Sequence, residues 1–118
     1  FGSTSVAVND VTLRTEGMSL FSASLCIVSR DAAFVMNPAG SQGNLCLGGQ
    51  VGRYVFDVMN SGATGSIELG IDLTSIAQPN GPIAATAGDT WRFQVWFRDA
   101  NPTPTSNFTD AVAIDFVL

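Results

Sequence analysis

The sequence predicts an all-β protein, built as a two-sheet antiparallel β-sandwich of about eight strands in a jelly-roll-like arrangement. No stretch keeps apolar residues at i, i+3 and i+4 over three helical turns, and 12 Gly and 5 Pro interrupt the chain at short intervals. Between these interruptions apolar and polar residues alternate with a period of two, as on a strand with one buried face. At 118 residues the chain fits a single domain, residues 1–118.

The chain opens with an expected strand over Ser3–Val8, in which Val6 and Val8 face inward. Asn9-Asp10 then shifts the parity of the alternation. We therefore expect a bend or bulge before the next strand, Val11–Thr15.

A further strand is expected over Phe21–Val28, where apolar and small residues alternate, with a short return strand at Ala33–Met36. Residues Asn37–Gly52 are rich in Pro, Gly, Ser, Asn and Gln, which indicates a long connection. We expect the apolar segment Leu45-Cys46-Leu47 to attach this connection to the rest of the domain at one point.

The second half of the chain has the clearer strand patterns. Val51–Met59 is a long β-prone run, and Ser66–Leu73 alternates as a strand with one dry and one wet face. Thr90–Leu118 holds two more strands joined by a polar, proline-containing loop, the second of them at Val112–Leu118. Along the first of these two strands the odd-numbered residues are apolar, and Trp96 stands among the polar, even-numbered ones.

Composition narrows the classes of function. Charged residues make up only 13% of the chain, against about 25% in ordinary soluble domains. A net charge of −5 with five scattered arginines argues against nucleic acid as a partner, because phosphate binding needs clustered cations. No apolar run approaches the roughly 18 residues of a membrane span, so we expect no transmembrane segment.

The chain contains no His and no Lys. Without them no serine can be activated by the usual bases, and the commonest metal ligand is missing. Glu68 and Asp72 could form a carboxylate pair, but on one strand face they would stand about 13 Å apart, beyond the range that glycosidases use. We expect a protein that is not an enzyme and needs no cofactor.

Cys26 and Cys46 are candidates for a disulfide, whose loop of about 20 residues would contribute about 3 kcal/mol of stability. The alternative is two reduced, buried thiols that act as small apolar residues. Only an oxidising compartment favours the disulfide. The chain begins at Phe1 rather than Met, which indicates a removed leader or a module of a longer protein, and either is compatible with export.

Two groups of motifs resemble a β-sandwich module that lies near the C-termini of large secreted and cell-surface bacterial proteins. The first group is Gly40–Gly49 followed by Gly52-Arg53-Tyr54. The second comprises Gly88–Trp91, Phe93-Gln94, Trp96, Arg98-Asp99 and Ser106–Asp110. The resemblance implies an extracellular or cell-surface, non-catalytic protein, and it supplies no assigned activity and no catalytic residues. Cys26 lies outside the matching motifs.

Trp96 is a candidate platform for a sugar ring, because Arg92, Gln94 and Arg98 share its side of the strand and can donate hydrogen bonds. The competing explanation is packing, in which a loop or a neighbouring subunit covers the indole. A glycan is therefore one candidate partner.

The segment Phe1–Val8 is the candidate for self-assembly, since an alternating strand such as this one, with Phe1, Val6 and Val8, can complete the sheet of another subunit. Its alternative is an ordinary first strand paired within its own domain. The absence of Lys, which usually protects sheet edges, favours assembly into a homo-oligomer or homopolymer. An extracellular fibre or surface layer is the function we expect, with a carbohydrate-binding or adhesive module as the alternative.

A proline-containing loop gathers candidate oxygen ligands for calcium: Asp99, Asn101, Asn107 and Asp110. Their spacing matches no established calcium loop, and capping of turns by Asn and Asp explains them as well. Asn107-Phe108-Thr109 is also a formal glycosylation sequon.

Overall fold

The computed structural model of the chain describes residues 2–36, 43–54, 57–100 and 104–118. This part is mostly β-structure and contains no α-helix, which confirms the predicted all-β class. The strands are β1 (Val11–Thr15), β2 (Ala23–Ser29), β3 (Asp31–Met36), β4 (Asn44–Gly48), β5 (Gly52–Arg53), β6 (Met59–Asn60), β7 (Ile67–Ile71), β8 (Thr90–Ala100), β9 (Pro104–Phe108) and β10 (Val112–Asp115). A 3₁₀ turn, η2 (Gly62–Thr64), precedes β7. No described helix is long and apolar enough to cross a membrane.

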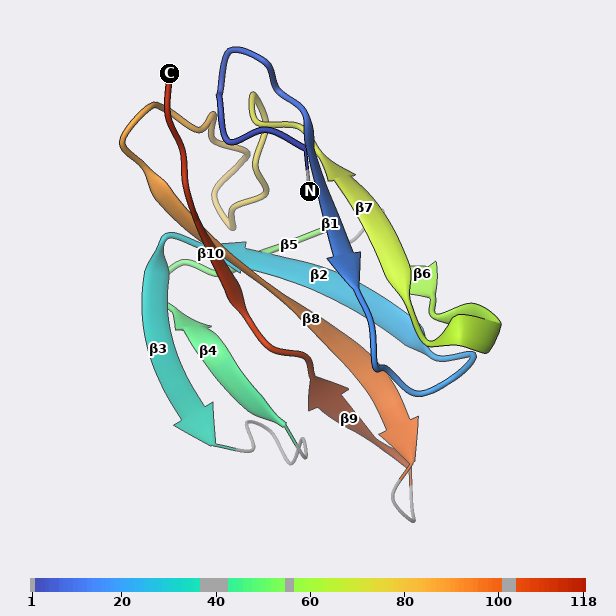
Figure 1. The fold of residues 1–118 in the computed structure, drawn as a ribbon. Helices are drawn as coiled ribbons and strands as arrows, with labels where there is room; N and C mark the ends of the chain where they lie inside the picture. The colour runs from blue at the N-terminus through green and yellow to red at the C-terminus, as the bar shows by residue number, and fades with distance from the viewer. Residues whose placement is uncertain (1, 37–42, 55–56, 101–103) are drawn as a thin grey trace.

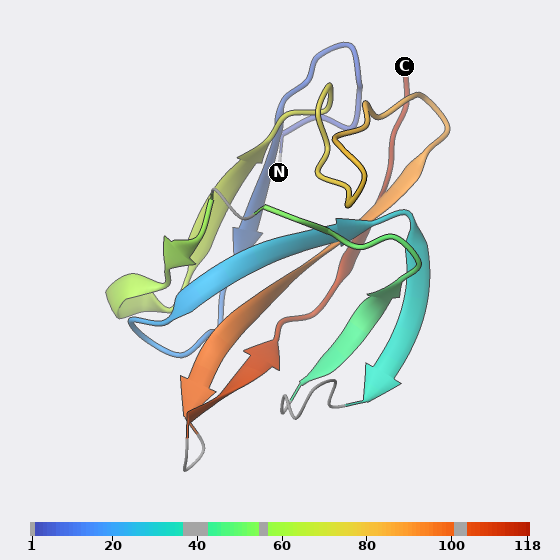
Figure 2. The same ribbon diagram turned by 180° about the vertical axis from the view of Figure 1, so that it is seen from behind.

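The strands form three antiparallel sheets (Figure 1). The largest has the order β10-β8-β2-β5, with β6 also paired to β2 and β9 also paired to β8. A second sheet joins β1 to β7, and a third joins β3 to β4. Both views place the β3–β4 pair on the opposite side of the molecule from β1 and β7 (Figures 1 and 2). The structure is therefore a sandwich with an additional two-stranded sheet, rather than two sheets alone.

The core lies between the β1–β7 pair and the large sheet. Four side chains of β8 that alternate along the strand are at most 5% exposed, namely Trp91, Phe93, Val95 and Phe97. They pack in one cluster with Ile67, Leu69 and Ile71 of β7 and with Cys26 and Val28 of β2. Burial of such apolar side chains stabilises a fold by about 1.5–3 kcal/mol each. The alternation read from the sequence over Ser66–Leu73 and Thr90–Arg98 is confirmed.

The expected strand Ser3–Val8 is wrong. Its described residues make only isolated bridges, with Ser5 beside Val117, and turns follow from residue 6. The chain bends at Asn9, whose φ of 51° lies in the left-handed region that Asn tolerates better than most residues. The Asn9 side chain fixes this bend by accepting a hydrogen bond from the Leu73 N–H at 2.7 Å.

The long strand expected at Val51–Met59 is also wrong, since the described residues of this stretch form only the short strand β5 and the start of β6. Gly52 lies so close to the Ala77 carbonyl that a Cβ atom would not fit. Beyond β5 the Asp57 N–H donates to the Tyr54 carbonyl at 3.0 Å. Contacts with a distant loop therefore override the β-propensity of the run.

Candidate functional site

The outer face of the large sheet carries the even-numbered side chains of β8, opposite the core. Trp96 lies between two apolar neighbours in the strand register, Leu25 on β2 and Phe108 on β9. Alternation along β8 thus puts an aromatic side chain on the sheet face that the β1–β7 pair leaves uncovered.

Gln94 does not share the surface with Trp96, although the sequence placed both on one face. It is 2% exposed, and its side-chain amide binds main-chain groups on two other segments. Its Nε2 donates to the carbonyls of Asn44 at 2.8 Å and Thr109 at 2.7 Å, and its Oε1 accepts from the Cys46 N–H at 3.0 Å. With donor and acceptor both used, Gln94 anchors β4 and the residue that follows β9 to β8 rather than meeting a ligand.

Arg92 is likewise held by the protein. Its Nη1 donates to the Arg30 carbonyl, and Arg92 does not line the cavity that contains Trp96. Of the four residues predicted to form this site, namely Trp96, Arg92, Gln94 and Arg98, the structure therefore brings only Trp96 and Arg98 together in the groove.

Trp96 and Arg98 line a groove of about 560 Å³ on this outer face. The Arg98 guanidinium lies over the Trp96 ring, 4.9 Å from its centroid, in the geometry of a cation–π contact. The other lining side chains are mostly apolar: Leu25, Ile27, Leu45, Val51, Arg53, Ser106 and Phe108. The volume falls in the range of small-molecule and peptide sites.

The charge of this groove differs from that of the chain. The whole protein carries −5, yet among the described residues the groove is lined by two of the five arginines and by no carboxylate. The ion pairs among the described residues both belong to Arg14, which contacts Glu16 at 2.8 Å and Glu68 at 3.0 Å. The groove therefore suits a partner that combines apolar surface with negative charge.

Strand β3 is a second exposed feature. From the sequence we predicted only a short return strand here. All six residues of β3 are exposed, and in the described part of the chain the strand pairs only with β4. Phe34 is 66% exposed, Val35 is 42% exposed and Met36 is 72% exposed. An edge strand of this kind offers unpaired main-chain groups to another chain.

The predicted assembly segment Phe1–Val8 is bonded within its own chain. The Val6 N–H donates to the Val117 carbonyl at 2.8 Å, and the Val117 N–H donates to the Thr4 carbonyl at 3.0 Å. Val6 packs against the core, whereas Val8 is 59% exposed, and Phe1 lies outside the described residues.

The expected disulfide between Cys26 and Cys46 does not form, since both are free thiols. Cys26 points into the core from β2, where desolvation raises its pKa to about 12. Cys46 lies half-buried on β4, which is paired to β3 outside the core cluster. The loop length permitted a bridge, but the two strands direct their thiols into different environments.

The candidate calcium residues are only partly described. The side chain of Asp99 and all of Asn101 lie outside the described residues. Asn107 accepts a hydrogen bond from the Phe108 N–H at 2.9 Å, and a Cβ atom on Gly43 would overlap its Oδ1. Among described residues no group of three or more His, Cys, Asp or Glu side chains could hold a metal ion. Asn107 is half-buried.

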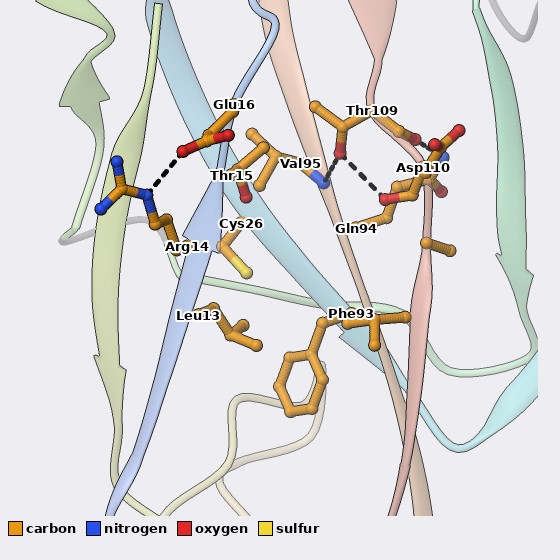
Figure 3. Close-up of a pocket in the computed structure, with 12 residues that line it drawn as sticks. Leu13, Arg14, Thr15, Glu16, Cys26, Phe93, Gln94, Val95, Thr109 and Asp110 are labelled. Carbon is orange, nitrogen blue, oxygen red and sulfur yellow. Dashed lines mark hydrogen bonds and ion pairs between the residues drawn. The ribbon is translucent and has the colours of Figure 1, made fainter. Parts of the chain in front are cut away.

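A smaller opening of about 270 Å³ lies between β1 and the β8–β10 edge (Figure 3). Leu13, Cys26 and Phe93 gather on one side of it, with the Arg14–Glu16 pair and Thr109 flanking them. The pKa of Arg14 is raised chiefly by its hydrogen bond to Glu16. Arg14 is already paired, and core side chains form the bottom of the opening. We therefore interpret the opening as a gap between two sheets and not as a candidate active site.

No family model, curated protein or solved structure matches the chain. The candidate site therefore rests on geometry alone. Sequence reasoning identified Trp96 and Arg98 but missed Arg53, whose place beside them depends on strand register. It also missed the exposure of β3, although four consecutive apolar residues at Ala33–Met36 were a usable signal.

Proposed function

We propose that this chain is a non-catalytic module of a secreted or cell-surface protein that self-associates through strand β3 into an extracellular fibre or layer. The observation that carries the proposal is that all six residues of β3 are exposed, with the second edge of the strand unpaired in the described chain. Association removes its apolar side chains from water and gives its main-chain groups partners.

Nothing in β3 protects it against such pairing. Exposed edge strands are commonly guarded by Lys, Pro or inward-pointing charges. The chain has no Lys, β3 contains no Pro, and its single charge is Asp31 at the first position. Charged residues make up only 13% of the chain, so few charged side chains are available to guard its strand edges.

The non-catalytic assignment rests on the side chains that are available. With no His and no Lys, the chain offers no ordinary base for a nucleophile. The extracellular setting rests on the resemblance of the Gly40–Gly49 and Gly88–Asp110 motifs to modules of exported bacterial proteins.

Sedimentation velocity and electron microscopy at tens of micromolar test the proposal. We expect oligomers or filaments for the native sequence and a monomer for Phe34→Ser/Met36→Ser. Leu20→Ser is the matched control, because Leu20 is also 57% exposed but lies between β1 and β2. If the native chain stays monomeric, the proposal is wrong.

A second candidate function is binding of a glycan in the groove, favoured by the Trp96 indole with Arg98 4.9 Å from its ring centroid. Trp96→Ala should then abolish retention on immobilised polysaccharide while the melting temperature changes little. Arg92→Ala is the control, because Arg92 lies outside the groove. Equal retention of the two variants would exclude this candidate.

A further inference from the structure

The groove around Trp96 and the exposed strand β3 are unlike surfaces with complementary chemistry. The groove has an apolar floor, with Arg53 and Arg98 as its charged side chains. Strand β3 presents Phe34, Val35 and Met36, with Asp31 as its only charge. The groove therefore supplies positive charge over an apolar floor, and β3 supplies exposed apolar side chains with a negative charge.

The two surfaces also agree in length. The register places Arg53 opposite Ile27, which in turn stands opposite Gln94, so Arg53 shares a row with Gln94. Arg98 lies two strands away from Arg53 and four residues further along, which separates their Cα atoms by about 16 Å. The six residues of β3 span about 17 Å from end to end.

Charge favours this contact over other contacts between copies. Two molecules of net charge −5 repel each other on average. The part of the groove that the structure describes is lined by arginines and by no carboxylate, which removes that repulsion locally, and an acidic residue on the incoming strand adds attraction.

We propose that the groove receives β3 of a second copy of this chain, with Phe34 and Met36 on the groove floor and Asp31, which the register places on the same face of β3 as Met36, facing a groove arginine. The inference rests on the self-association proposed above and names its receiving surface. Because the donating and receiving surfaces differ, the contact is heterologous, and it extends into a fibre when the rotation between copies does not close.

A charge exchange tests the pairing. Arg53→Glu and Arg98→Glu are made separately, each alone and together with Asp31→Arg in the same chain. All three residues are exposed, so the fold should survive, and melting temperatures check this. Arg14→Glu is the control, since it changes the net charge equally and lies outside the groove.

We expect at least one groove reversal to weaken self-association by about fivefold or more relative to Arg14→Glu, and Asp31→Arg to restore it. Sedimentation velocity over a concentration series measures the effect. If both reversals match Arg14→Glu while Phe34→Ser/Met36→Ser abolishes assembly, β3 is the contact but the groove does not receive it, and the inference is overturned. A native chain that remains monomeric overturns the proposed function itself.

Discussion

The side-chain Oε1 of Gln94 accepts a hydrogen bond from the main-chain N–H of Cys46 at 3.0 Å and thereby ties β4 to the outer face of β8. The same amide donates to the carbonyls of Asn44 and Thr109. One buried side chain thus holds three segments that bound the groove.

Gln94→Met should destabilise the fold by about 2–4 kcal/mol, because it leaves buried main-chain groups without partners. Urea denaturation measures the loss, and faster hydrogen exchange at the Cys46 amide would locate it at β4. Gln50→Met is the control at an exposed position. Equal stability of the two variants would show that Gln94 is not an anchor.

The two thiols should differ sharply in reactivity. Cys46 is half-buried and Cys26 is buried in the core, so a thiol reagent at pH 8 should label Cys46 first and Cys26 only after unfolding. Mass spectrometry of the labelled native protein should show one adduct. If the native protein had no reactive thiol and a mass lower by two hydrogens, the conclusion would be that Cys26 and Cys46 form a disulfide.

Stability should fall in alkaline solution. Burial raises the pKa of Cys26 from 9.0 to about 12 and also raises the pKa of Tyr54, so the folded state holds protons that the unfolded state releases. The stabilisation from Cys26 is present below pH 9 and is lost as pH rises toward 12, at up to about 1.4 kcal/mol per pH unit.

Cys26→Ala should reduce this pH dependence even if it lowers the stability at pH 7. The measurement is the free energy of unfolding between pH 8 and 11, with Cys46→Ala as control. A slope that Cys26→Ala leaves unchanged would assign the alkaline loss to other groups, Tyr54 first.

The parts of the fold that the sequence predicted are those in which one strand face is apolar. On β7 and β8 strict alternation specified which side chains enter the core, and the structure agrees. Strand β2 is different, because Leu25 and Ile27 are apolar as well as Cys26 and Val28. The sequence of β2 therefore could not predict that Leu25 and Ile27 line the groove while Cys26 and Val28 enter the core.

Long-range contacts account for the remaining errors. The apolar spacing of Ser3–Val8 suited a strand, but its N–H groups bond to Asp10 and Val117 at positions that no local pattern reveals. The groove joins Arg53 to Arg98 through the register of three strands. Sequence alone could identify Trp96 as unusual, whereas its neighbours depend on that register.

Two glycines offer a direct test of the packing that breaks the long run at Val51–Met59. A Cβ atom on Gly52 would overlap the main chain at Ala77, whereas one on Gly70 would have no atom within 4 Å. Because main chain yields less readily than a side chain, Gly52→Ala should cost about 3 kcal/mol or more. Gly70→Ala, within β7, should be neutral or stabilise by up to about 1 kcal/mol. Urea denaturation of both variants distinguishes the two sites. If Gly52→Ala were as stable as Gly70→Ala, the close approach of β5 to Ala77 would be excluded, and a continuous strand from Val51 would again be tenable.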